Sequence, residues 1–405
     1  MLYALLAIFV TLIIFGLVRG YKFGALMKMS VSNLKAARNI VIVMLMVGAM
    51  TALWRVGGTI PYIVSLTSGA LEPAVFLPVA FLMNSAISAL TGTSVGTAAS
   101  IGAICMSVGN ALGISPAVCG GVVLSGAFFG DRCSPVSTSA LLVAEVTQTN
   151  LYDNIRGMIR TCIVPFAVAL AVFAVMGFLV DANAGGNTSV GIFENFYNFH
   201  WTLVLPAVSI LILALFRIDV KINMLVSIAI AAAITCVMQG VEITEVAKIA
   251  FIGYDAPKEI SAMMSGGGVL GMVKLCCIIL ISLTFVGLFK GMGILDKIRG
   301  PVQRLGNRSP FGCMIATAFT TCMVSCNQSM CIILTNELCK NVVRDNNKRA
   351  IYIENSSVVI AGLVPWSMAS IIPLGAMGAP TASILFAAYL YLIPLSQWIF
   401  KKKSN

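Results

Sequence analysis

Charged residues are scarce in this chain. Of its 405 residues only 10% are charged and 59% are hydrophobic, and the mean hydropathy is +0.97. Soluble domains carry about a quarter of their residues as charges, so a soluble globular protein is excluded. Apolar stretches long enough for helices recur throughout. We predict an all-α polytopic membrane protein, because helices satisfy every backbone polar group inside lipid.

Histidine and paired cysteines are also lacking. The chain has one histidine, His200, and its 12 cysteines include no Cys-x-x-Cys pair. Metal sites and nucleophilic catalysis draw on such residues at defined spacing. We therefore expect no enzyme, no metal centre and no cofactor, and we interpret the cysteines as small packing residues.

Acidic residues number 15 against 26 basic ones, which gives a net charge of +11. The basic residues form short clusters between apolar spans, at 19–38, 156–160, 217–221, 290–308, 340–349 and 401–403. The positive-inside rule explains this pattern better than nucleic-acid binding. We predict a multi-pass protein of the cytoplasmic membrane, with these clusters inside and segments 182–199 and 240–265 outside.

These constraints give the first half of the chain its expected topology. Its predicted spans are 2–18, interpreted as a membrane helix rather than a signal peptide, 39–57 and 161–181. Between them lie a re-entrant hairpin, 74–113, and a broken helix, 116–148. The hairpin tip is 91–97 and the helix break is 130–135. Residues 150–160 are expected to form an interfacial helix.

The second half repeats this order in the opposite orientation. Its predicted spans are 201–216, 221–239, 267–289 and 381–400. A hairpin at 309–340 has its polar centre at 325–329, and a broken helix at 350–379 has its break at 362–367. Such inverted-topology repeats are typical of secondary transporters.

The repeat divides the chain into two parts. Residues 1–181 are the first inverted repeat, and residues 182–405 hold a linking helix followed by the second repeat. The span at 201–216 has no counterpart at the start of the first half. Either the repeat is imperfect or the first half has lost an N-terminal helix.

Asp131 and Arg132 interrupt an apolar segment, because residues 117–130 and 136–144 carry no charge. Asp131 lies roughly 20 Å into a hydrocarbon core about 30 Å thick. Ionisable residues at that depth are functional-site candidates. Gly130 and Pro135 do not favour a continuous helix, and broken helices in transporters bind ions. Two alternatives remain for the pair: an ion pair that fixes the break, or an Arg132 that tunes Asp131, binds a substrate carboxylate or snorkels.

Four polar segments are expected to meet near the membrane midplane: 91–97, 131–139, 325–329 and 354–367. An aspartate there can exchange a proton for Na⁺, a hard cation that prefers oxygen ligands. The candidate ion- or substrate-binding residues are Thr91, Thr93, Ser94, Asp131, Arg132, Ser134, Ser137, Thr138, Asn327, Gln328, Glu354 and Ser357. Two interpretations remain for Glu354: it is an ion ligand, or it is an acid at a helix N-terminus, where the helix dipole stabilises negative charge.

Three segments resemble the NhaC-type Na⁺/H⁺ antiporter family. They are SGAFFGDRCSPVSTSALL at 125–142, followed by TNLYDNIRGMIRT, then ALTGTSVGTAASIGA at 89–103 and ENSSVVIAGLVPWS at 354–367. The resemblance covers roughly residues 40–170 and 310–395. It implies the inverted-repeat architecture of the wider ion-transporter superfamily and an exchange of Na⁺ for H⁺.

The chain departs from the family pattern at three positions. The family's second acid falls on Thr138, its GDQ-like element reads Cys326-Asn-Gln328, and its IPWN element reads Val364-Pro-Trp-Ser367. Two carboxylates are therefore missing. A site built on Asp131 and Glu354 is expected to bind one cation or to couple differently from the family pattern.

Our first hypothesis is a secondary antiporter that exchanges Na⁺ for H⁺, with Asp131 as the cation and proton site. The alternative is a Na⁺- or H⁺-coupled exchanger of carboxylates, such as malate and lactate, or of amino acids, in which Arg132 meets the substrate carboxylate. A channel or structural subunit requires a continuous polar pore face, which the interrupted helices do not provide. The expected partners are the lipid bilayer, Na⁺, H⁺, a small carboxylate or amino acid and a second copy in a homodimer, with no nucleic acid.

The two hairpins are expected to open to opposite sides of the membrane, because opposite charge biases flank them. Single cysteines at the bases of 74–113 and 309–340, in a background without native thiols, test this with an impermeant reagent. The first base should react from outside and the second from inside. Equal reactivity of both bases from one side contradicts the inverted repeat.

Overall fold

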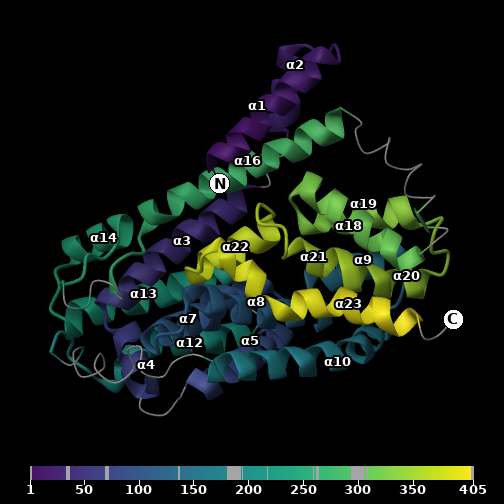
Figure 1. Cartoon of the computed structure of the whole chain (residues 1–405). Helices are drawn as coiled ribbons and strands as arrows, with labels where there is room; N and C mark the ends of the chain where they lie inside the picture. Colours follow the sequence, from purple (N-terminus) through teal and green to yellow (C-terminus); the bar gives the residue numbers. More distant parts are fainter. Residues whose placement is uncertain are drawn as a thin grey trace.

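The chain folds almost entirely into helices (Figure 1). The computed structural model describes residues 2–402 apart from 33–36, 69–72, 136, 180–192, 194, 217, 259, 261–263, 293–304 and 307–308. Among the described residues, the β interaction is one isolated bridge between Tyr254 and Gly266. The all-α prediction is confirmed. Much of the expected outer segment 182–199, much of the basic cluster 290–308, and residues Lys35, Arg217 and Val136 lie outside the described residues.

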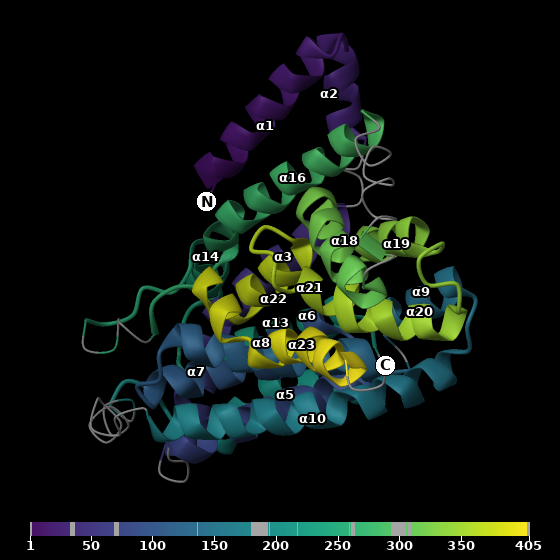
Figure 2. The ribbon, with the colours of Figure 1, turned by 45° about the vertical axis from the view of Figure 1, so that its right-hand side comes forward.

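The N-terminal part of the chain forms five helices, of which the first two stand apart from the rest. The five are α1 (Leu2–Val18), α2 (Phe23–Val31), α3 (Ala37–Val56), α4 (Thr59–Ser68) and α5 (Pro73–Thr91). In both ribbon views α1 and α2 extend away from the other helices and pack against the long helix α16 (Val269–Gly291) (Figure 2). The helix α3 lies deeper and packs against α16 as well.

A nearly continuous helix follows α5 after a turn at Gly92. It consists of α6 (Ser94–Thr97), the π-helical turn η2 (Ala98–Gly102) and α7 (Ala103–Ala111). Next come α8 (Pro116–Cys133), α9 (Thr138–Thr147) and α10 (Leu151–Phe178). The expected interfacial helix 150–160 and span 161–181 form a single helix, α10, which corrects that prediction. Pro165 inside it does not end it, since Pro kinks more often than it terminates a well-packed membrane helix.

The remaining elements complete the bundle. They are the 3₁₀ turn η3 (Trp201–Val204), α12 (Leu205–Leu215), α13 (Val220–Met238), α14 (Ile243–Ile252), α18 (Pro310–Ser325), α19 (Gln328–Cys339), α20 (Asn346–Ile353), the π-helical turn η5 (Glu354–Val358), α21 (Val359–Ala361), α22 (Met368–Met377), the 3₁₀ turn η6 (Thr381–Phe386) and α23 (Ala388–Lys402).

Four stretches in the described residues are long and apolar enough to cross a membrane: Ala74–Thr91, Leu151–Phe178, Lys221–Met238 and Thr381–Ile399. Large apolar side chains of α10 are exposed, among them Ile163 at 60% and Val175 at 57%. In water such a face is unfavourable, whereas lipid accepts it. Length, composition and exposure together support a polytopic membrane protein.

The two expected hairpins differ in their packing. The helices α18 and α19 pack against each other as the two arms of one hairpin. By contrast, α5 packs most extensively against α8, and its stretch Ala74–Thr91 alone reaches the length of a span. The re-entrant nature of both hairpins and the inverted repeat therefore stay predictions.

Glycines let α8 lie close to its neighbours. A Cβ on Gly130 would overlap the backbone of Ser88 and Ala89 in α5, and one on Gly126 would come within 2.8 Å of the Phe81 carbonyl oxygen. Small residues at such contacts are the usual means of close helix packing in membranes. The sequence assigned Gly130 to the helix break, whereas the structure places it inside α8, where its missing side chain permits this contact.

Aromatic rings fill the space on the other side of α8. The Tyr389 ring of α23 lies 5.9 Å from Phe129, 6.2 Å from Phe81 and 6.4 Å from Phe166, measured between ring centroids. These rings come from α5, α8, α10 and α23. The C-terminal helix is thereby anchored to the first half of the chain.

Gly130→Ala is expected to lower stability by about 1–3 kcal/mol, because an extra methyl group in a filled contact forces helices apart. Gly271→Ala is the matched control, since a Cβ on this α16 glycine meets nothing within 4 Å. Thermal unfolding of both variants in detergent measures the difference. Equal unfolding temperatures would show that α5 and α8 have room to separate.

Candidate functional site

Asp131 lies in the last turn of α8 and is 4% exposed. Gln328 Nε2 donates to one carboxylate oxygen over 3.1 Å, and the Ser137 hydroxyl lies 3.3 Å from the other. The side chains of Ser94 and Ser139 also interact with the carboxyl group. All four partners are neutral. Asp131 is therefore surrounded by polar groups that orient it, and no cation among the described residues is in contact with it.

The first helix break follows Asp131 directly. The chain leaves α8 at Cys133, and Ser134 adopts an extended conformation (φ −88°, ψ 136°). Pro135 ends the helix there because it lacks an N–H and its ring clashes with the preceding turn. The break is thus one turn later than the predicted 130–135.

Two serines satisfy the backbone groups that this break frees. The hydroxyls of Ser137 and Ser139 both donate to the Asp131 carbonyl oxygen, the second over 2.7 Å. Ser137 Oγ also accepts from the N–H groups of Ser139 and Ala140 at the start of α9. This is an N-cap, and it fixes the same hydroxyl beside the Asp131 carboxylate.

The second break lies between α18 and α19. Cys326 adopts the left-handed conformation (φ 53°), and the Asn327 side chain accepts from the Met330 N–H over 3.2 Å as the N-cap of α19. Gln328, the first residue of α19, donates to Asp131 and to the Val358 carbonyl over 3.2 Å. Its amide therefore joins the first break to η5.

The third turn, between α5 and α6, is also closed by a side-chain N-cap. Gly92 has φ +67°, and Thr93 Oγ1 accepts from the Gly96 N–H over 3.3 Å. Thr97 Oγ1 lies 3.3 Å from Thr91 Oγ1 and donates to the Thr93 carbonyl over 2.9 Å. Ser94, the first helical residue after this cap, faces Asp131.

The fourth interruption separates α21 from α22 over residues 362–367. Ser367 caps α22 by accepting from the Ala369 N–H over 3.2 Å. The Met368 N–H donates to the Cys326 carbonyl over 2.9 Å, and Cys322 Sγ lies 3.8 Å from Ser367 Oγ. The fourth interruption is thus bonded to the second.

Arg132 is fully buried and points away from Asp131. Its guanidinium donates to Asn355 Oδ1, to Thr161 Oγ1 over 2.9 Å and to the Tyr389 hydroxyl over 3.4 Å. These partners belong to η5, α10 and α23. Arg132 therefore ties α8 to three other elements, two of them from the second half.

The ion pair considered between Asp131 and Arg132 is not formed. In the part of the chain that the structure describes, the ion pairs join Arg156 to Asp153 and Lys248 to Glu245, all at exposed positions. Arg132 also has no open approach for a substrate carboxylate, because side chains enclose its donors. The structure does not support either contact for Arg132.

Glu354 and Asn355 begin the π-helical turn η5, and both are fully buried. Asn355 Nδ2 donates to Gln397 Oε1 over 2.8 Å, while its oxygen accepts from Arg132. Both carboxyl oxygens of Glu354 lack a hydrogen-bond partner among the described residues. A π-helical turn inside an α-helix often marks a functional site.

The structure thus sorts the candidate residues. Ser94, Ser137 and Gln328 surround Asp131, whereas Thr91, Thr93 and Asn327 shape the turns that present them. Thr138 is exposed and Ser134 is buried. Glu354 lies near enough to Arg132 to interact with its charge, and Ser357 stands on the same turn η5 as Glu354.

Sequence reasoning missed three residues of this region, whereas Ser139 was among the hydroxyls expected to supply oxygen ligands. Asn355 stands inside the polar segment 354–367, so the pattern included it without singling it out. Thr161 and Tyr389 are isolated polar residues in apolar helices and carry no local signal. Their contact with Arg132 arises only when α10 and α23 pack beside α8.

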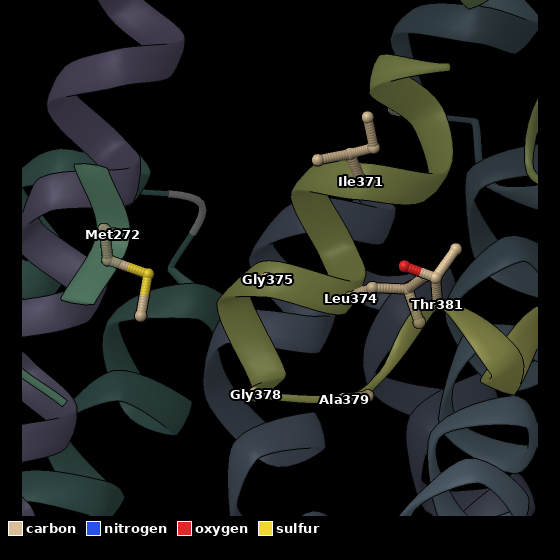
Figure 3. Close-up of a pocket in the computed structure, with 7 residues that line it drawn as sticks. All are labelled: Met272, Ile371, Leu374, Gly375, Gly378, Ala379 and Thr381. Atoms are coloured by element: carbon tan, nitrogen blue, oxygen red, sulfur yellow. The ribbon is translucent and has the colours of Figure 1, made fainter. Parts of the chain in front are cut away.

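A separate cavity of about 200 Å³ lies between α16 and the end of α22 (Figure 3). Met272 contributes from α16, and the other lining residues are Ile371, Leu374, Gly375, Gly378, Ala379 and Thr381. Thr381 supplies the one polar side chain of this lining. Because a cation site requires several oxygen ligands, this cavity is not the ion site.

A family model described as the Na⁺/H⁺ antiporter family matches residues 1–150 and 128–400. The chain belongs to the Na⁺/H⁺ antiporter family. The resemblance of the sequence motifs to this family is thereby confirmed. Antiport across a membrane is the activity that membership assigns to the chain.

Three relatives show how varied the cargo of similar proteins is. The malate-2H⁺/Na⁺-lactate antiporter of Bacillus subtilis is 26% identical over 96% of this chain and 87% of its own length. The arginine/ornithine antiporter ArcD of Halobacterium salinarum is 25% identical over 85% and 74%. The Na⁺/H⁺ antiporter NhaC of Alkalihalophilus pseudofirmus is 24% identical over 91% and 83%.

Arg132→Gln is expected to destabilise the fold, because Asn355, Thr161 and Tyr389 lose their donor. Each buried polar group left unsatisfied costs about 1–3 kcal/mol. Arg156→Gln, at a side chain that is 79% exposed, is the control and should unfold at the wild-type temperature. Thermal unfolding compares the two. An Arg132→Gln protein of full stability with a raised KM for a carboxylate would instead make Arg132 a substrate ligand.

Proposed function

We propose that this antiporter exchanges Na⁺ for H⁺ across the cytoplasmic membrane and that Asp131 binds the Na⁺. One observation carries the proposal. The buried Asp131 carboxylate lies where three helices begin, at Ser94 of α6, at the cap Ser137 of α9 and at Gln328 of α19.

Helix N-termini favour a negative charge, because their free N–H groups and aligned peptide dipoles point toward it. Asp131 is the acid that meets these termini. The arrangement stabilises an ionised carboxylate in a place that otherwise disfavours charge. An ionised carboxylate without a protein cation in contact is a suitable binding partner for a small cation.

The surrounding groups also provide the oxygens that a hard cation prefers. Ser94, Ser137 and Ser139 carry hydroxyls next to the carboxylate, and a rotation of the Gln328 amide would present its oxygen in place of its NH₂ group. Backbone carbonyls at the adjoining helix breaks supply further ligands, as unwound segments do in secondary transporters.

Exchange requires that this site open to one side of the membrane at a time. The Asp131 partners come from α6 and α9 in the first half and from α19 in the second half. Relative movement of two such halves around a fixed site is the alternating-access arrangement of inverted-repeat transporters. We propose that the two hairpins whose tips hold Thr93 and Asn327 control access to the site from opposite sides of the membrane.

A second candidate function is exchange of small organic ions, which two of the relatives suggest by name. In this case the substrate carboxylate would bind at the helix N-termini around Asp131 rather than at the enclosed Arg132. Vesicles loaded with malate, lactate, arginine or ornithine separate this candidate from the first, because proton flux would then require the organic ion.

Asp131→Asn is expected to abolish Na⁺-driven proton flux in reconstituted vesicles while leaving the fold intact, since Asn keeps the shape but loses the charge. Asp153→Asn is the matched control, because that side chain is 65% exposed and lies in a surface ion pair. A pH-sensitive dye inside the vesicles reports the flux after NaCl addition. Wild-type rates in a folded Asp131→Asn protein would exclude Asp131 as the cation site.

A further inference from the structure

Three residues beside the Asp131 site hold buried polar atoms without partners. In the described part of the chain these are both carboxyl oxygens of Glu354, the hydroxyl of Ser357 and Nε of Arg132. Glu354 and Ser357 are both fully buried and stand three residues apart on the π-helical turn η5. Buried polar groups without hydrogen bonds are rare, so such a cluster calls for a physical explanation.

Glu354 has electrostatic neighbours but no hydrogen-bond donor. Asp131 and Arg132 are both near enough to interact with its charge, and Cys133 lies in the same group. No ion pair involving Glu354 appears among the described residues. A fully buried carboxylate without donors is strongly unfavourable, so this surrounding favours the neutral acid.

The elements packed against η5 carry other titratable groups, but the charges that act on Glu354 are those of Arg132 and Asp131. The other groups with described side chains are Glu145 on α9, Cys313 and Cys322 on α18, Cys331, Glu337 and Cys339 on α19, Lys348, Arg349 and Tyr352 on α20, and Tyr389 and Tyr391 on α23. Glu145 is exposed, and the Arg349 guanidinium is bound to Asn336, Asn346 and the Val343 carbonyl. Arg132, which directly follows Asp131 in the chain, is therefore the described cation that acts on the charge of Glu354.

The two acids differ in what they can bind. Asp131 has three hydroxyls and one amide around it, as a Na⁺ site requires. No described residue forms a hydrogen bond with the Glu354 carboxyl oxygens, so the ligands around it are too few for a hard cation that takes about six. A proton needs one oxygen. Glu354 is thus suited to carry H⁺ and Asp131 to carry Na⁺.

We propose that Glu354 is the proton site, separate from the Na⁺ site at Asp131, and that Arg132 makes the two ions mutually exclusive by balancing one carboxylate at a time. This proposal rests on the proposed Na⁺/H⁺ exchange. With Glu354 protonated, the Arg132 charge balances ionised Asp131. With Na⁺ at Asp131, the same Arg132 charge balances ionised Glu354.

The exchange step conserves charge. Na⁺ binds the Asp131 carboxylate, the O–H bond of Glu354 breaks, and its proton passes to water on the side to which the site is open. The three side chains and their bound ion have a net charge of zero before and after. An uncompensated charge in this buried place would be strongly unfavourable, so Na⁺ and H⁺ exclude each other and exchange one for one.

Proton release on Na⁺ binding tests this division. Full-length protein in weakly buffered detergent solution near neutral pH is titrated with NaCl, and a pH indicator counts the protons released. Wild type should release protons as Na⁺ binds. Glu354→Gln should bind Na⁺ more weakly and release none, whereas the exposed control Glu337→Gln should behave as wild type. Proton release from Glu354→Gln equal to that of wild type overturns the proposal and assigns the proton to Asp131.

Infrared spectroscopy provides a readout that needs no transport. The carbonyl band of a protonated carboxylic acid should be present in wild type without Na⁺, disappear when NaCl is added and be missing from Glu354→Gln. A wild-type spectrum that lacks this band near neutral pH overturns the proposal, even if the variant fails to fold. If wild type shows the band but neither binds Na⁺ nor loses the band with NaCl, the proposed Na⁺/H⁺ exchange is wrong, whereas Glu354 still carries a proton.

Discussion

Each interruption of a helix inside a membrane frees backbone N–H and C=O groups that lipid cannot bind. The described part of this chain contains four interruptions between apolar helices, and each is closed by a cap from the segment itself: Thr93, Ser137, Asn327 and Ser367. Because the caps fix where the next helix begins, they also fix which side chains face inward. The functional site is therefore a consequence of backbone hydrogen bonding, since the same hydroxyl of Ser137 caps α9 and lies beside the Asp131 carboxylate.

Close packing holds these interruptions next to one another. Gly130 lets α8 contact the backbone of α5, and Arg132, two residues later, binds η5, α10 and α23. One turn of α8 thus combines a close helix contact, a fully buried cation and the candidate ion-binding acid. A shift of α8 would move Asp131 away from Gln328 and separate Arg132 from Asn355, so stability and ion binding depend on the same residues.

The positions at which the chain departs from the family pattern can be located in the structure. Thr138, at the position of the family's second acid, is exposed and does not face Asp131. Gln328 keeps its contact with Asp131 although Asn327 replaces the acid that directly precedes it in the family pattern. Relatives of this fold are named for ions as different as Na⁺, malate and arginine. Such variety is expected when the cargo is chosen by the few side chains at helix ends rather than by the bundle itself.

The sequence by itself determined the all-helical membrane class, the family and the polar segments that contain Asp131, Gln328 and Glu354, because hydropathy, charge clusters and motifs are local properties of the chain. It misplaced the first break, since the cost of Gly130 in a helix is overridden by its contact with Ser88. It also divided α10 into two helices. Only the tertiary structure decided that Arg132 turns away from Asp131 toward Thr161, Asn355 and Tyr389, and that no described residue donates a hydrogen bond to Glu354. These contacts join residues up to 257 positions apart, and no local pattern encodes a partner at such a separation.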